Sequence, residues 1–207
     1  MSTDNISTIL AFDQQSEEVS THRQADHAVH PIFINRWSPR AYSNQLVSDD
    51  VLHTVLEAAR WAPSSNNIQP WRFIIAKTEE QLKIFQSFIN PNNRLWSDHA
   101  PILIVLASNK LNANGGPNGA HAFDTGAAWG SLALQASLLG LITHAIGGFD
   151  REQARTLLNV PDELELHAVI ALGYRGDKES LPEALQEREK PNGRKPISES
   201  IWEFKSE

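Results

Sequence analysis

The sequence predicts a single domain of mixed α/β or α+β class. Segments with the apolar spacing of amphipathic helices alternate along the chain with four short runs rich in β-branched, aromatic and leucine side chains. No segment repeats, and 207 residues are enough to bury one sizeable core. Charged residues make up 21% of the chain and apolar residues 41%, which is ordinary for a globular protein and too apolar for a disordered one.

The first 30 residues are polar and have no sustained periodicity. We therefore expect a flexible leader, a tail or an arm, over residues 1–30 and one domain over residues 31–207. No basic stretch leads into an apolar one near the N-terminus, so a secretory signal is not expected. The chain has no cysteine, which excludes disulfides, thiolate nucleophiles and cysteine-ligated metal centres and is compatible with a reducing cytosol. We expect a cytoplasmic protein.

The net charge of −7 repels phosphate backbones and anionic lipid, so neither nucleic acid nor a membrane is an expected partner. The stretch between Asp124 and Asp150 has no charged side chain, which could suit a membrane span. However, polar side chains such as Gln135 and His144 interrupt it, and Gly140 divides it. The stretch therefore predicts a buried helix followed by a strand.

The first clear helix follows Ser48, a helix-capping residue that precedes two acidic residues. Its apolar residues share one face, and Pro63 ends the segment. A polar loop over 64–70 separates it from a strand over 71–76, whose residues are mainly aromatic and β-branched. Thr78 and Gln81 then match a capping box, which predicts another helix that Pro91 interrupts.

A second strand over 102–106 is apolar on both faces, which predicts a central place in the sheet. After a loop over 112–119, a long and almost uncharged helix is expected over 123–139, ended by Gly140. Because this helix is apolar all round, it has to be covered on all sides. A third strand over 141–146, a short helix that ends near 158, a fourth strand over 166–172 and a charged, proline-containing tail complete the chain.

Several common catalytic motifs are missing from the sequence. It has no G-x-S-x-G, no G-x-x-x-x-G-K-[ST] and no G-x-G-x-x-G after a strand, so hydrolase, ATPase and dinucleotide-fold interpretations lack their usual support. His27 and His30 are close enough for a metal pair but have no evident third ligand. We expect no metal site, and we expect the other histidines to be solvated or to lie in the core.

Residues 36–40 form the first cluster that suggests a ligand. Arg36, Ser38 and Arg40 alternate along the chain, so in an extended segment their side chains share one face. Two guanidinium groups with a hydroxyl between them suit a phosphate or another ligand with several oxygens. The alternative is a surface loop with two solvated arginines.

Residues 63–71 form the second cluster, a polar loop between a helix and a strand. Its hydroxyl and carboxamide side chains donate and accept hydrogen bonds without net charge, as a heterocycle with alternating acceptors and N–H groups requires. The alternative is a helix-to-strand turn that satisfies its own backbone.

These clusters, together with three later ones, resemble the FMN-dependent nitroreductase family. The matching segments are Arg36-x-Ser38-x-Arg40, Glu57 to Ser65 with Asn67-x-Gln69-Pro70-Trp71, Ile146-Gly147-Gly148-Phe149, Leu172-Gly173-Tyr174 and Arg194-Lys195-Pro196. The resemblance implies an α+β fold with a mixed central sheet flanked by helices. It also implies an intertwined homodimer with two FMN sites across the subunit interface, which would cover the long uncharged helix.

The resemblance further implies which residues bind the cofactor. The matching positions are Arg36, Trp37, Ser38, Arg40, Pro63, Ser64, Ser65, Asn67, Gln69, Ile146, Gly147, Gly148, Arg194 and Lys195. The group at 36–40 would hold the phosphate, the ribityl chain and the pyrimidine edge, with Arg40 nearest N1 and O2. The group at 63–69 would come from the partner subunit, with Gln69 contacting the ring or ordering the loop. Backbone N–H groups at 146–148 would lie near N5 and O4, and the group at 194–195 would close on the phosphate.

Three details stay open or depart from the family pattern. An asparagine before the second strand often touches the flavin in this family, and both Asn92 and Asn93 fit. Arg175 stands where a proline is usual, which could alter the neighbouring loop. The leader over residues 1–30 is longer than the fold needs, and we expect it to leave cofactor binding untouched.

The activity implied by the resemblance is an NAD(P)H oxidoreductase that reduces nitroaromatics, quinones or similar small acceptors. NADH or NADPH would pass hydride to flavin N5 and leave before the acceptor enters, a ping-pong cycle in which no side chain is catalytic and Arg40 stabilises the reduced flavin. The loop over 112–119 would discriminate among acceptors. The alternatives are a specialised member, either a flavin-fragmenting oxygenase or a reductive dehalogenase, and a non-catalytic flavin-binding protein.

Overall fold

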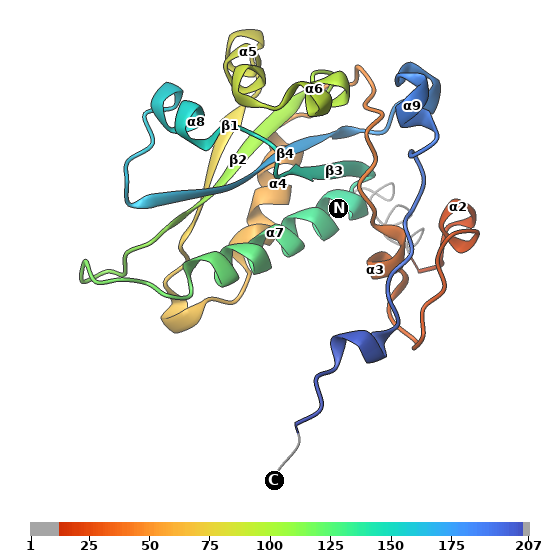
Figure 1. The fold of residues 1–207 in the computed structure, drawn as a ribbon, viewed down its shortest axis with the longest axis horizontal. Coiled ribbons are helices and arrows are strands. Elements are labelled where there is room, and N and C mark those ends of the chain that lie inside the picture. Colours follow the sequence, from red (N-terminus) through yellow and green to blue (C-terminus); the bar gives the residue numbers. More distant parts are fainter. Residues whose placement is uncertain (1–12, 205–207) are drawn as a thin grey trace.

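A four-stranded antiparallel sheet forms the centre of the computed structural model, which describes residues 13–204 (Figure 1). The strand order is β1-β2-β4-β3. The strands are β1 (Trp71–Ala76), β2 (Ile102–Asn109), β3 (Leu141–Ile146) and β4 (Leu164–Tyr174). The α+β class is confirmed. Every strand pair of the described sheet is antiparallel, whereas a mixed sheet was expected. Strands β2 and β3 run in the same direction, but β4 lies between them and is antiparallel to both.

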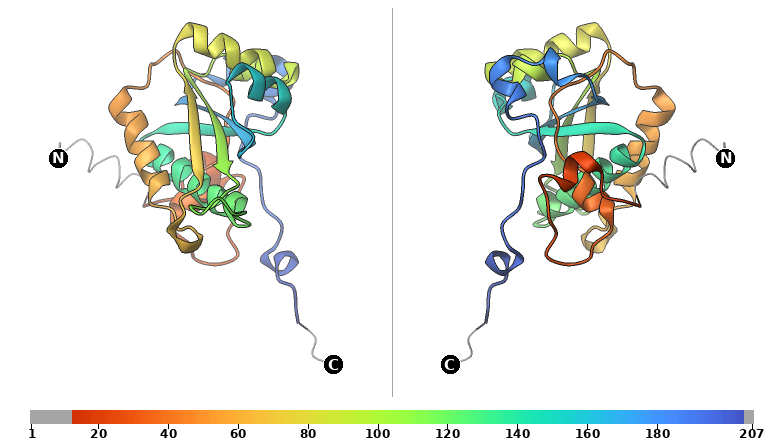
Figure 2. Two further views of the ribbon diagram at one scale, coloured as in Figure 1. Left: turned by 90° about the vertical axis from the view of Figure 1, so that its left-hand side faces the viewer. Right: turned by 90° about the vertical axis from the view of Figure 1, so that its right-hand side faces the viewer.

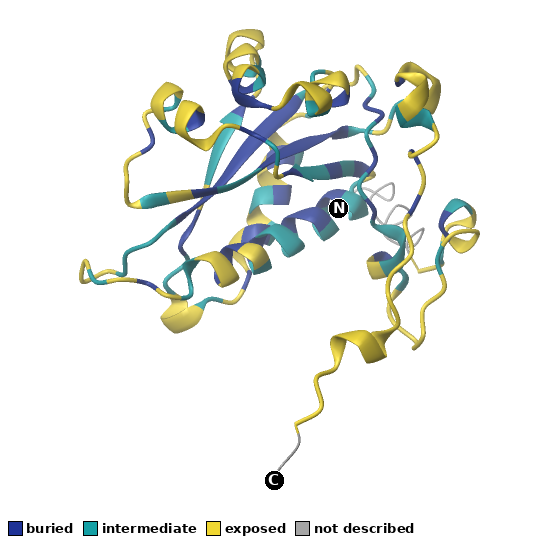
Figure 3. Ribbon diagram, viewed as in Figure 1, coloured by how far each residue is buried: buried dark blue, intermediate teal, exposed yellow. Residues whose placement is uncertain are grey.

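Helices cover both faces of the sheet (Figure 1). One face carries α4 (Asp49–Arg60) and α7 (His121–Leu138), and the other carries α5 (Glu79–Phe88), α6 (Pro91–Ser97) and α8 (Arg151–Leu157). Strand β2 is buried along almost its whole length between the two helical layers, as Figure 3 shows. The prediction of a central second strand is therefore confirmed.

The helix boundaries follow the capping signals in the sequence. The Ser48 hydroxyl accepts a hydrogen bond from Val51 N at 3.3 Å, and Thr78 forms the expected capping box with Gln81. Gly140 has a φ of +74° just after the end of α7, a conformation that favours glycine. One interpretation was incomplete: Pro91 does not simply interrupt a helix but occupies the first turn of α6, where proline loses no hydrogen bond.

Parts of the N-terminal and C-terminal segments of the described chain lie side by side on the outside of the domain (Figure 1). The N-terminal part contains the short helices α2 (Glu17–Ser20) and α3 (Pro31–Asn35). The C-terminal part contains α9 (Glu183–Gln186) and the 3-10 turns η2 (Lys178–Ser180) and η3 (Ile197–Ser200), and then leaves the body (Figure 2). Within the leader, residues 1–12 lie outside the described residues, while residues 13–30 form an arm against the domain.

Arg175, which stands where a proline is usual in the family, contacts this arm. The Arg175 guanidinium binds both carboxylate oxygens of Glu18 at 2.5 and 2.6 Å, and it lies 5.0 Å from the centre of the Trp37 ring. The residue that replaces the family's usual proline therefore contacts the leader that the family core does not require. Within residues 13–204, no helix combines the length and the apolar character needed to cross a bilayer.

Candidate functional site

The segment over residues 36–40 follows α3 and crosses the edge of the sheet beside β3. Arg36 is the C-cap residue that follows α3, and its Nη1 donates to the Trp37 carbonyl at 3.2 Å and to Ser38 Oγ at 3.4 Å. The predicted proximity of Arg36 and Ser38 is therefore present. Trp37 is buried beneath the Arg175 guanidinium.

A buried carboxylate, Glu189, holds the other end of this segment. Its Oε1 accepts hydrogen bonds from the backbone N–H groups of Arg40, at 2.8 Å, and Ala41, at 3.1 Å, and Oε2 lies 3.9 Å from Arg40 Nη1. The Glu189 side chain has no exposed surface. Glu189 was not among the residues predicted from the sequence, because it stands in a charged run and its partners are about 149 positions away.

His144 holds the same segment from the sheet. This residue of β3 has its Nδ1 3.1 Å from the Pro39 carbonyl, and its ring lies 4.4 Å from the Trp96 ring. Burial lowers the pKa of His144 to about 4. The hydrogen bond to Pro39 raises the pKa, but the charges of Arg40 and Arg36 lower it further. His144 is therefore neutral at pH 7, and its Nδ1–H donates to the Pro39 carbonyl. The expectation of a structural histidine fits this position.

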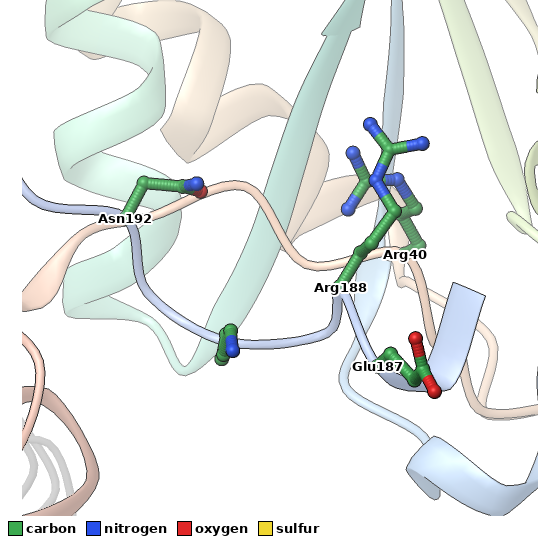
Figure 4. A pocket seen from close by; sticks show the side chains of 5 residues that line it. Arg40, Glu187, Arg188 and Asn192 are labelled. Carbon is green, nitrogen blue, oxygen red and sulfur yellow. The ribbon is translucent and has the colours of Figure 1, made fainter. Parts of the chain in front are cut away.

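A cavity of about 600 Å³ opens beside Arg40 (Figure 4). It is lined by Arg40, Glu187, Arg188, Lys190 and Asn192. Three of the lining residues are cations and one is a carboxylate, and the buried Glu189 lies behind Arg40, so the cavity still carries net positive charge. In Figure 4 the side chains of Arg40 and Arg188 cross beside the cavity; burial lowers the pKa of Arg40, and the charge of Arg188 adds to this effect. The arrangement favours a ligand with negative charge.

A second group of cations in the site consists of Arg36 and Arg194, whose positive charges repel each other. Burial, and then the charge of Arg194, lowers the pKa of Arg36. Among residues 13–204, no carboxylate lies within 4 Å of either guanidinium. Two neighbouring cations with no carboxylate partner in the described part of the chain favour a dianionic group such as a phosphate. Lys195, by contrast, is paired with Glu199 at 3.2 Å.

The two glycines after β3 have the backbone features expected next to a planar ligand. The backbone N–H groups of Gly147 and Gly148 donate no loop hydrogen bond to any of residues 13–204. A Cβ atom on Gly147 would meet nothing within 4 Å. A Cβ atom on Gly148 would lie 2.8 Å from Asn93 Nδ2, and Asn93 donates to the Gly148 carbonyl at 3.3 Å. Asn93, rather than the exposed Asn92, therefore lies beside this loop, while Ile146 is buried.

The loop over residues 63–69 contains the 3-10 turn η1 (Ser65–Asn67) and is strained. Asn66, Asn67 and Gln69 all have φ between 49° and 56°, an uncommon region for residues other than glycine. Hydrogen bonds support it: Gln69 N donates to Ser64 Oγ at 3.1 Å, and Ser65 N donates to the buried Asp124 carboxylate at 3.1 Å. The loop therefore satisfies part of its own backbone, while Pro63, Ser65 and Asn67 are exposed.

One chain does not bring this loop to the segment over 36–40. The loop is tied to Asp124, in the first turn of α7, and lies at the lower left in Figure 1, whereas α3 lies at the right. Helix α7 has 18 residues and is about 27 Å long at 1.5 Å per residue. The residues assigned to one site from the sequence therefore form two separate groups on a single chain.

Comparisons with known proteins agree with these observations. The family model described as "Nitroreductase family" matches residues 34–96 and 86–174. The chain is 33% identical over 153 residues to an Archaeoglobus fulgidus protein named "Putative NADH dehydrogenase/NAD(P)H nitroreductase", covering 72% of this chain and 86% of that protein. A solved "oxidoreductase containing FMN" is similar at 39% identity and a TM-score of 0.84, covering 88% of this chain and 95% of the other. A Desulfovibrio desulfuricans "putative nitroreductase in complex with fmn" has 25% identity and a TM-score of 0.69, covering 88% of this chain and 100% of the other.

Glu189→Ala is expected to destabilise the fold. The substitution leaves the N–H groups of Arg40 and Ala41 without their acceptor, at a cost of about 1.5–3 kcal/mol, the range for hydrogen bonds to a charged group. Urea unfolding measures this cost. Glu183→Ala, an exposed position at the start of α9, serves as the control and should change stability by less than about 0.5 kcal/mol. Equal effects of the two substitutions would show that Glu189 does not hold the segment.

His144 is expected to make stability depend on pH between about 4 and 6.5. In that range the unfolded chain takes up a proton at His144 that the folded protein does not, so stability falls as the pH falls through the window. The slope for one such group is at most about 1.4 kcal/mol per pH unit. Urea unfolding at pH 7 and pH 5 should show a smaller loss for His144→Gln than for the unsubstituted protein. His53→Gln, on the exposed side of α4, should keep the full loss.

Proposed function

Because the chain belongs to the nitroreductase family, we propose that it is an FMN-dependent oxidoreductase that takes electrons from NADH or NADPH and reduces nitroaromatics, quinones or similar small electron-poor acceptors. The observation that carries the proposal is the pair of neighbouring arginines, Arg36 and Arg194, which have no carboxylate within 4 Å among residues 13–204. FMN, when bound, supplies the hydride chemistry, so the protein's task is to bind, orient and stabilise it.

The residues of one chain would hold the charged and the polar parts of the cofactor. Arg36 and Arg194 would bind the phosphate, with Ser38 beside them. Arg40, fixed through its backbone by Glu189, would hold positive charge at the pyrimidine edge, where it favours the reduced cofactor. The N–H groups of Gly147 and Gly148, which donate no loop hydrogen bond within residues 13–204, would face the opposite edge of the ring.

A second copy of the chain would complete the site with the loop over residues 63–69. The separation of this loop from Arg36 and Arg40 along α7 supports a homodimer with the cofactor at its interface. Exposed apolar side chains support it too: Phe123 at the start of α7 is 84% exposed, and Trp202 in the tail is 94% exposed. The predicted covering of α7 on all sides is not provided by one chain, since Cβ atoms on Gly126 and Gly130 would meet nothing within 4 Å.

Turnover measurements test the proposed function. The protein reconstituted with FMN is expected to oxidise NADH or NADPH in the presence of a quinone or a nitroaromatic compound, with the parallel lines of a ping-pong cycle. Turnover with only a halogenated phenol or with oxygen would favour the specialised family members instead. FMN binding without turnover of any acceptor would indicate a non-catalytic flavin-binding protein.

Arg36→Ala is expected to weaken FMN binding by about 1.5–3 kcal/mol, the scale of a lost charge-assisted hydrogen bond. A fluorescence titration of the cofactor-free protein with FMN measures the dissociation constant. Lys83→Ala, which removes an exposed cation on α5, is the control and should leave the constant unchanged. An unchanged dissociation constant in the Arg36 variant would mean that the phosphate binds elsewhere.

A further inference from the structure

Arg23, in the N-terminal arm, joins three separate parts of the chain. Its Nη1 donates to the carbonyl of Ile34 at 2.5 Å and to the carbonyl of Arg36 at 2.9 Å. Its Nε donates to the carbonyl of Asn192 at 2.7 Å. One guanidinium thus connects the arm, the segment that carries Arg36 and the C-terminal segment.

This guanidinium lies beside the two arginines already assigned to the phosphate. Arg194 Nη1 donates at 3.3 Å to the same Asn192 carbonyl that accepts from Arg23 Nε, so the two cationic groups meet at one oxygen. Arg23 and Arg194 also line one cavity of about 630 Å³. Three guanidinium groups, those of Arg23, Arg36 and Arg194, are therefore gathered around the junction of the two chain ends.

No carboxylate in the described chain pairs with these three guanidinium groups. Within residues 13–204, no carboxylate lies within 4 Å of the Arg23 guanidinium. Asp26 lines the same cavity, but its Oδ2 accepts a hydrogen bond from Ile197 N. Burial, and then the charges of Arg194 and Arg36, lowers the pKa of Arg23, as expected for a cation held against other cations.

One nitrogen of the Arg23 guanidinium, Nη2, is available to bind a ligand. Nη1 and Nε are used by carbonyl groups, whereas Nη2 donates to none of the residues that the structure describes. A guanidinium fixed by carbonyls on one side, with an unused donor beside two further cations, suits a phosphate oxygen.

We propose that Arg23 is a third cationic ligand of the FMN phosphate, so that the N-terminal arm forms part of the cofactor site. This inference rests on the proposed function, because it takes the ligand to be FMN. It also reverses the expectation that the leader leaves cofactor binding untouched. The arm and the C-terminal segment would then enclose the phosphate from two sides.

Comparison of FMN with riboflavin, which lacks the phosphate, tests the proposal. Arg23→Gln removes the charge while keeping an amide that can donate to a carbonyl. We expect the affinity for FMN to fall by about tenfold or more in this variant, as for a lost charge-assisted hydrogen bond, and the affinity for riboflavin to stay within about twofold. Arg155→Gln is the matched control, because Arg155 also donates to three backbone carbonyls, at the far end of α8; both affinities should stay unchanged.

Two outcomes would overturn the proposal. Equal loss of FMN and riboflavin affinity would show that Arg23 only connects the chain segments, and an unchanged FMN affinity would show that it does not reach the phosphate. Circular dichroism confirms that the variants fold, and Arg23→Lys, which keeps the charge, should lie between Arg23→Gln and the unsubstituted protein. If the unsubstituted protein bound neither flavin, the proposed function would fail as well, so the two failures are distinguishable.

Discussion

The buried carboxylate of Glu189 is the interaction on which the arrangement of the site depends. Its hydrogen bonds to the N–H groups of Arg40 and Ala41 tie the C-terminal segment to the segment over 36–40. That connection positions Asn192 and Arg194, five positions or fewer beyond Glu189, beside Arg36. Because the Glu189 side chain has no exposed surface, separating the two segments would leave a buried charge without its hydrogen bonds, which is costly. The positive charges of Arg36, Arg40 and Arg194 in these two segments favour the binding of an anion.

The second constraint is the length of α7. This helix fixes the loop over 63–69 at one end, through Asp124, and packs against α3 toward the other. Because the helix is rigid, neither group can move to meet the other within one chain. In the proposed homodimer, a second copy of the chain would provide the missing loop and would cover the open side of the helix at the same time. Binding the cofactor and burying the apolar surface are thus two consequences of one proposed association.

Local signals in the sequence were enough for most of the fold. Ser48, Thr78 with Gln81, and Gly140 act within one or two turns of where they stand, so helix limits could be read from them. The apolar run of β2 likewise revealed its central place. The interactions that sequence reasoning missed join distant residues: Glu189 with Arg40, Arg23 with Asn192, and Arg175 with Glu18. Such pairs have no periodicity, and each member looks like an ordinary surface charge until the chain is folded.

The central claim is that each cofactor site is divided between two chains, and a defined heterodimer tests it most directly. One chain carries Arg36→Ala, and the other carries Ser64→Ala together with Asn67→Ala in the loop; two affinity tags allow the mixed dimer to be isolated. In the mixed dimer, one site would contain both substituted groups and the other would contain neither. The expected result is about one FMN per mixed dimer, with FMN largely lost from either homodimer. A mixed dimer that binds no FMN, although the unsubstituted protein does, would show that the loop and the arginines do not share a site across the interface.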